Sequence, residues 1–245
     1  MSVLTLRLAG PLQSWGASAR FARRTTESAP TKSGVIGLLA AAAGIQRGDD
    51  ASLKPLAALR FGVRIDQPGT RLRDFHTAHH SVSGKSMPLS ERFYLADAVF
   101  VAALEGDHTL LAGLHAALRD PVYPPFLGRR SCPPAQPVDL ALHDATTLED
   151  ALHDTPWQAS AWHRRQRRRD PVVTLTVLRE ADENETHADV LRDQPLSFAA
   201  EHRRHALRTV VSTTVDLPSP AAAPTRPAPR HDPFDALEEE SARCS

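Results

Sequence analysis

Thr31-Lys32-Ser33-Gly34-Val35-Ile36-Gly37-Leu38-Leu39 begins a run of small and apolar residues that continues through alanines to Ala43 and stops at Gly44. Thr31 or Ser33 can cap a helix at this start, and glycine is a common helix stop. Because the run is apolar nearly all round, it predicts a buried helix. Before it, Val3-Leu4-Thr5-Leu6-Arg7-Leu8 alternates apolar and polar residues, which predicts a strand with one buried face.

The chain beyond this helix continues the alternation of strands and helices. We expect a short helix near 53–59, strands over 60–65, 98–104 and 138–142, and a helix over 110–118. The order β-α-β-β-α-β is typical of a ferredoxin-like or RRM-type sheet with helices on one face. The predicted fold class is therefore α+β.

Three regions do not belong to this repeating pattern. Residues 74–92 are polar and rich in His and Ser, which indicates a long hairpin or excursion from a domain spanning 1–145. Alternating runs at 172–178 and 209–215 predict a small antiparallel extension within 146–215. The proline- and alanine-rich segment 216–245 cannot bury a core, and we expect it to be disordered.

Composition narrows the class of protein without choosing a function. The 245 residues have no net charge, but residues 1–85 hold 12 Lys/Arg against 5 Asp/Glu, whereas residues 86–160 hold 4 against 10. Such a division can present cations on one face. Arginine greatly outnumbers lysine, which suits phosphate binding, although a G+C-rich genome would produce the same bias. With two cysteines, and with Arg7 interrupting the first apolar run, we expect a reduced cytoplasmic protein without signal peptide or membrane span.

Five local strings, in order along the chain, carry a more specific signal. They are Leu8-Ala9-Gly10-Pro11-Leu12-Gln13-Ser14-Trp15-Gly16, residues 30–39, Gly44-Ile45-Gln46-Arg47, Asp74-Phe75-His76-Thr77, and residues 125–133. They resemble the CasD family of type I-E CRISPR Cascade subunits, over about residues 1–210. The resemblance implies a RAMP-type palm with a projecting thumb hairpin at about 74–92. It also implies a non-catalytic subunit, without cofactors, that holds the 5′ handle of the guide RNA for antiviral DNA interference. The implied partners are the backbone RAMP subunit, the large PAM-recognising subunit and target DNA within the complex.

The residues that could bind the RNA fall in three loops and the excursion. Thr31, Lys32 and Ser33 begin the buried helix, where free N–H groups favour a phosphate, although helix capping alone would also explain them. Gly128 and its paired arginines lie in a stiff proline-bracketed loop that can clamp phosphates, or be a solvated turn. Trp15 is either a wedge against the core or a stacking platform. The complete set of candidates is Gln13, Trp15, Arg20, Arg23, Arg24, Thr31, Lys32, Ser33, His76, Leu127, Gly128, Arg129, Arg130 and Ser131.

Other functions have weaker support in the sequence. A metal-independent endoribonuclease that processes repeat RNA is the main alternative, with His76, His79, His80, Tyr94 or Tyr123 as base, but no triad-like spacing appears. The same histidines lack a carboxylate or cysteine pair at metal-ligand spacing. A generic RRM-type reader would need aromatic strings that are absent. The basic run 163–169 either adds nonspecific phosphate contacts or is simply solvated.

Overall fold

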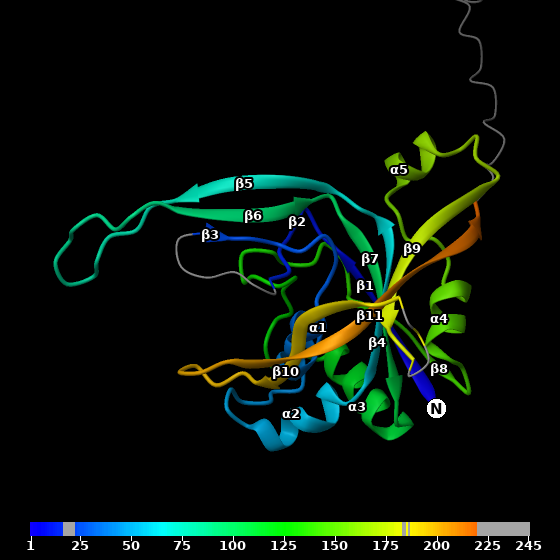
Figure 1. Cartoon of the computed structure of the whole chain (residues 1–245), viewed down its shortest axis with the longest axis horizontal. Helices are drawn as coiled ribbons and strands as arrows, with labels where there is room; N and C mark the ends of the chain where they lie inside the picture. Colours follow the sequence, from blue (N-terminus) through cyan, green and yellow to red (C-terminus); the bar gives the residue numbers. More distant parts are fainter. Residues whose placement is uncertain (17–22, 183–184, 186, 220–245) are drawn as a thin grey trace, which may run out of the picture.

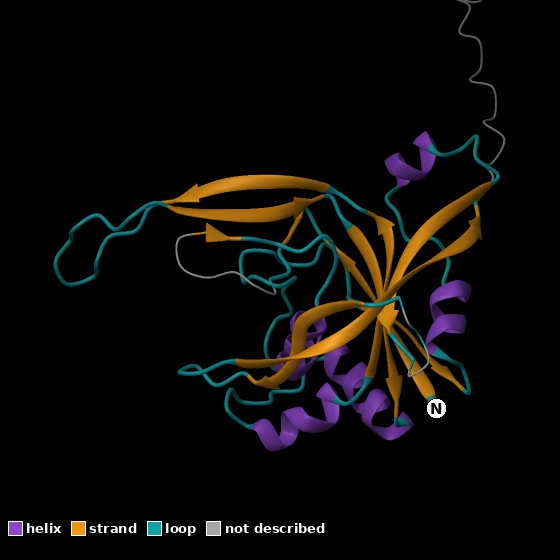
Figure 2. Ribbon diagram, viewed as in Figure 1, coloured by secondary structure: helices purple, strands orange, loops and turns teal. Residues whose placement is uncertain are grey.

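The computed structural model describes residues 1–16, 23–182, 185 and 187–219. It is a mixed α+β structure built on a seven-stranded antiparallel sheet with the order β10-β11-β9-β4-β7-β1-β8, which confirms the α+β class (Figures 1 and 2). The sheet strands are β1 (Ser2–Ala9), β4 (Arg60–Gln67), β7 (Val99–Gly106), β8 (Asp139–Asp144), β9 (Val172–Glu180), β10 (Asp189–Ser197) and β11 (Arg204–Pro218).

Strand β7 shows how the sheet buries both faces. Phe100, Ala102 and Leu104 belong to the main core with α1 (Lys32–Ala42), α2 (Asp50–Ala57) and α3 (His108–Arg119). Val101 and Ala103 point to the other face, into a smaller core with α4 (Leu148–Asp154). Successive side chains of a strand point to opposite faces of the sheet. A continuous apolar run therefore indicates a strand that is buried on both faces. The expectation of helices on one face therefore holds for α1–α3, while α4, which the sequence did not indicate, covers the opposite face.

A long hairpin leaves the sheet between β4 and β7. It consists of β5 (Thr70–His76) and β6 (Ser90–Ala96), paired in register from Thr70–Ala96 to His76–Ser90 (Figure 1). The short strands β2 (Leu12–Gln13) and β3 (Arg23–Arg24) pair with β6 and complete a second sheet. The region 74–92, expected to form a long hairpin or excursion, is the outer part of a hairpin that begins at residue 70. The bounds of its strands were not predicted, because backbone pairing between them sets where the hairpin begins and ends.

The C-terminal strands extend the main sheet instead of forming a separate layer. Strand β9 pairs with β4, β11 pairs with β9, and β10 pairs with β11 at the edge. A short helix, α5 (Ala161–Gln166), precedes β9. Strand β11 continues to Pro218, so the first residues of the expected tail are part of the sheet. The rest of that tail, from residue 220, lies outside the described residues.

A buried ion pair on β4 ties the segment between α4 and α5 to the main sheet. Arg64 and Asp66 on β4 are fully buried, with Arg64 Nε 2.7 Å from Asp66 Oδ1. Arg64 Nη1 also donates to the carbonyl of Thr155 at 2.6 Å, and Trp157 Nε1 donates to the carbonyl of Asp66 at 2.9 Å. These bonds hold the segment between α4 and α5, and they satisfy polar groups that would be costly to bury unpaired.

Candidate nucleic-acid interface

Two residues that the sequence predicted to contact RNA, Gln13 and Trp15, hold the loop after β1 against the core. Gln13 Nε2 donates to the carbonyls of Leu8 at 3.0 Å and Ala98 at 2.8 Å, and Trp15 Nε1 donates to Gln13 Oε1 at 3.0 Å. Both side chains are fully buried. Trp15 is therefore the wedge and not the stacking platform, and Gln13 has its amide groups engaged within the protein. Both residues position the loop instead of facing a ligand.

The loop over residues 126–132 packs against this wedge. Leu127 is fully buried, and its carbonyl accepts a hydrogen bond from Ser14 N at 3.1 Å. Gly128 follows with a φ of +82°, and a Cβ there would overlap the Ser14 carbonyl oxygen. The sequence predicted that Leu127 contacts RNA. Its side chain is instead buried and anchors the loop. Gly128, Arg130 and Ser131 are exposed and Arg129 is half-buried.

Arg129 braces the base of the hairpin. Its guanidinium lies over the Tyr94 ring at 4.8 Å, and Nη2 donates to the carbonyl of Arg24 at 2.9 Å. Arg23 lies over the Phe93 ring at 5.3 Å, and its side chain is largely exposed. Arg23, Arg24 and Arg129 thus gather beside β6. Arg20 lies outside the described residues.

The start of α1 is partly occupied by the protein itself. Thr31 caps the helix by accepting from Gly34 N at 3.3 Å. Lys32 N donates to Asp193 Oδ2 at 2.8 Å, and Lys32 Nζ lies 2.7 Å from Glu180 Oε1. Burial lowers the pKa of the Lys32 ammonium, and Glu180 opposes that shift. The expectation that Lys32 meets a phosphate is therefore corrected, because only 3% of this residue is exposed. Of the three predicted residues, only Ser33 is half-exposed.

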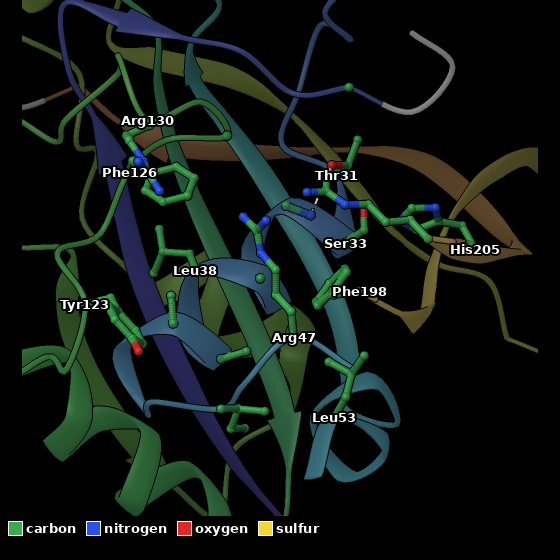
Figure 3. A pocket seen from close by; sticks show the side chains of 18 of the residues that line it. Thr31, Ser33, Leu38, Arg47, Leu53, Tyr123, Phe126, Arg130, Phe198 and His205 are labelled. Atoms are coloured by element: carbon green, nitrogen blue, oxygen red, sulfur yellow. Dashed lines mark hydrogen bonds between the residues drawn. The ribbon is translucent and has the colours of Figure 1, made fainter. Parts of the chain in front are cut away.

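A groove of about 900 Å³ opens beside this helix and brings three distant segments together. Arg47 follows α1, Arg130 lies in the 126–132 loop, and Arg203 precedes β11. Figure 3 shows Arg47 and Arg130 extending into the same space, with Phe126 and Phe198 beside them. The polar, charged and aromatic residues of its lining that could contact a ligand include Ser33, Arg47, Tyr123, Phe126, Arg130, Phe198, Arg203 and His205. Cations next to aromatic rings can hold phosphates and unstacked bases together.

The acids at the rim of the groove are engaged elsewhere. Asp49 caps α2 by accepting from Ser52 N at 3.0 Å, and Asp50 lies 3.2 Å from Arg204. Burial, followed by the charge of Arg203, lowers the pKa of His205. Asp49 and Asp50 form no ion pair with Arg47, Arg130 or Arg203, so the three arginines that line the groove are not neutralised by these acids. The groove is thus suited to an anionic ligand.

Several groove residues escaped the sequence analysis. Arg47 stands inside a family-like string, so that string could have identified it. Phe198, Arg203 and His205 carried no local signal, because they reach the groove only through the β10–β11 pairing, far along the chain from α1.

The residues considered for catalysis do not gather. His76 Nε2 lies 2.5 Å from Asp74 Oδ2 on β5, and His79 and His80 lie in the hairpin turn. Tyr94 is buried under Arg129, and Tyr123 lines the groove without any of the three histidines. Across the described residues there is no group of three or more His, Cys, Asp or Glu side chains placed to hold a metal ion. Within the same residues, no helix is long and apolar enough to cross a membrane.

Comparisons with known proteins agree on one family. Residues 3–211 match the model of the CRISPR-associated protein (Cas_Cas5) family. Over 169 residues the chain is 38% identical to "CRISPR system Cascade subunit CasD" of Escherichia coli strain K12, covering 62% of this chain and 75% of that protein. A solved structure described as "Crystal structure of Cas protein" is 35% identical, with a TM-score of 0.68, 90% of this chain covered and 100% of the other. A chain of a "CRISPR RNA-guided surveillance complex" is 32% identical, with a TM-score of 0.70 and coverages of 91% and 95%. The chain therefore belongs to the CasD/Cas5 family of CRISPR-associated proteins.

Proposed function

We propose that this chain is a non-catalytic subunit of type I-E Cascade that holds the 5′ handle of the guide RNA in the groove beside α1. The observation that carries the proposal is the convergence of Arg47, Arg130 and Arg203, from three separate segments, around one space lined by aromatic rings. Arginine forks grip phosphates, while the rings and the free backbone groups of the 126–132 loop suit splayed bases. Arg23, Arg24 and Arg129 continue the cationic surface toward the hairpin.

The strand order and the long hairpin support the proposal that the chain is a RAMP-type protein. The strand order β8-β1-β7-β4, with α1 and α3 in the two connections, is that of a ferredoxin-like palm. The β5–β6 hairpin is the thumb, and β9–β11 form the C-terminal extension. Leu72, Phe75, Met87 and Leu89 are between 43% and 50% exposed on this hairpin, which suits burial against another subunit. The partners are the backbone RAMP subunit and the PAM-recognising large subunit, in a cytoplasmic complex that acts on target DNA.

The test is binding of the full chain to RNA with the repeat-derived 5′ handle, compared with a scrambled handle, by fluorescence anisotropy. Arg47→Ala/Arg130→Ala should weaken handle binding about 10- to 100-fold, because each lost charged contact is worth roughly 1.5–3 kcal/mol before compensation by water and neighbouring cations. Arg192→Ala is the matched control, since Arg192 is an exposed arginine on β10 outside the groove lining. Equal binding to both RNAs, or an equal loss with Arg192→Ala, would contradict the proposal.

Gel analysis of the same samples addresses the endoribonuclease alternative. Intact RNA after prolonged incubation is the expected result. Cleavage within the repeat sequence that persists in EDTA and is lost in His76→Ala or Tyr123→Ala would replace the binding role by a catalytic one.

A further inference from the structure

A second cationic surface lies on α5 and the turn that follows it. Five arginines are exposed there within six residues, namely Arg164, Arg165, Arg167, Arg168 and Arg169, and we call them the α5 patch. None of the five forms an ion pair with a carboxylate among the described residues, although Asp170 adjoins them in sequence. Trp162, which is 47% exposed, stands beside them with its ring edge-on to His163 at 5.5 Å. Five unneutralised guanidinium groups so close together repel one another, which favours a polyanionic partner.

The α5 patch is held on a firm base. Ser160 caps α5, and its N and Oγ both donate to Gln67 Oε1, at 3.1 and 2.7 Å. Trp157, 5% exposed, packs in a small core just before the helix and donates to the carbonyl of the buried Asp66. The cations are therefore presented by an anchored element, so a ligand would not have to order the loop that carries them.

The α5 patch lies far from the groove. Strand β11 joins the two regions: its first residues pair next to the β10–β11 turn, which lines the groove, and Pro218 at its end pairs with Val172, just after the patch. At about 3.3 Å per residue, 15 residues of strand span on the order of 45 Å. Figure 1 shows α5 at the upper right and the β10–β11 turn at the lower left, on opposite sides of the main sheet. One short RNA segment seated in the groove would not also cover the patch.

We propose that the α5 patch binds the phosphate backbone of nucleic acid, independently of sequence, at a site separate from the groove. All five cations are arginines, whose planar forks pair with phosphate oxygens bidentately. A sugar–phosphate chain presents charges at regular intervals along a line, which matches cations spread along one helix and turn. The same backbone chemistry is offered by duplex DNA and by single-stranded RNA. The proposal does not depend on which ligand fills the groove.

The experiment measures binding of the full chain to a labelled 24-base-pair DNA duplex and to a 24-nucleotide RNA, both of arbitrary sequence, between 50 and 300 mM salt. Arg164→Gln/Arg165→Gln/Arg168→Gln removes three charges from the patch. We expect binding at least about tenfold weaker at 0.1 M salt. The salt slope, meaning the slope of log K against log salt concentration, should decrease in magnitude by about 2.7 for the duplex or about 2.1 for the RNA. Each phosphate contact contributes about 0.9 to this slope for a duplex and about 0.7 for a single strand. A probe whose slope falls by the full amount expected for it is a ligand of the patch, and a probe whose slope is unchanged is not.

The matched control removes three charges from the groove instead, in Arg47→Gln/Arg130→Gln/Arg203→Gln. Its salt slope for the arbitrary probes should stay near that of the unaltered chain, and the patch variant should still prefer handle RNA over scrambled RNA. Circular dichroism of each variant shows that it is folded. An unchanged slope in the patch variant would overturn the proposal, as would an equal loss in both triple variants. So would displacement of both probes by polyglutamate at matched charge, since an acidic protein would then be the better partner.

Discussion

Replacing Gly128 with alanine tests whether the loop that carries Arg129 and Arg130 is fixed by its own backbone conformation and by contact with the neighbouring loop. Gly128 has a φ of +82°, and its added Cβ would overlap the carbonyl oxygen of Ser14. That carbonyl belongs to backbone, which cannot rotate away as a side chain could. The clash would also disturb the hydrogen bond from Ser14 N to the Leu127 carbonyl.

The magnitude follows from two separate costs. The left-handed conformation costs an alanine about 1–2 kcal/mol relative to glycine. Forcing a methyl group against well-packed neighbours costs roughly 1–3 kcal/mol more. The free energy of unfolding should therefore fall by about 2–5 kcal/mol. Gly84→Ala is the control, because Gly84 has a φ of +64° and a Cβ there meets nothing within 4 Å. Only the conformational cost, about 1–2 kcal/mol, applies at Gly84.

Urea unfolding followed by circular dichroism measures both variants against the unaltered chain, with the slope m checked for constancy. Alanine reduces the entropy of the unfolded chain in both variants, so this term cancels in the comparison. Gly128→Ala should also weaken handle binding, because Arg130 would move away from the groove, whereas Gly84→Ala should not. A difference in unfolding free energy below about 0.5 kcal/mol between the two variants would refute the proposed packing of the loop.

Three further predictions concern buried and titrating groups. Asp66→Asn should lower the unfolding free energy by about 3–5 kcal/mol in urea titrations, because it leaves the buried guanidinium of Arg64 without its carboxylate partner; a loss below about 1 kcal/mol would contradict this role of the ion pair. Lys32→Met should leave the affinity for handle RNA within about twofold, as measured by anisotropy, since its ammonium is buried against Glu180; a tenfold loss would restore it as an RNA contact. Burial lowers the pKa of His205 below that of the unfolded chain, so stability should fall as the pH drops below about 6.5 and level off below the folded pKa. A phosphate in the groove would raise that pKa, so handle affinity should increase from pH 7.5 to 5.5, and His205→Asn should abolish the increase.

Short-range patterns were enough to predict the strands and helices whose buried faces can be recognised from the order of neighbouring residues. The alternation at 3–8, the apolar runs at 34–43 and 98–104, and the amphipathic helix at 110–118 all became elements of the central sheet and its main helical face. The hairpin around 74–92 was predicted without the bounds of its strands, and β10 and α4 were not predicted, because long-range pairing and packing specify them. The basic run 163–169 was visible, but its distance from the groove was not.

The sequence by itself determined the family, because its characteristic strings are contiguous and retain their order along the chain. It also identified the 128–131 loop and the start of α1 as places of interest. Only the tertiary structure decided which of those residues face outward. Trp15 and Leu127 are buried by the loops that pack on them, and Lys32 is buried by a carboxylate 148 positions further on. Likewise, Arg47, Arg130 and Arg203 share one groove because the β10–β11 turn folds back beside α1. Burial and convergence depend on contacts between distant segments, and no local pattern contains them.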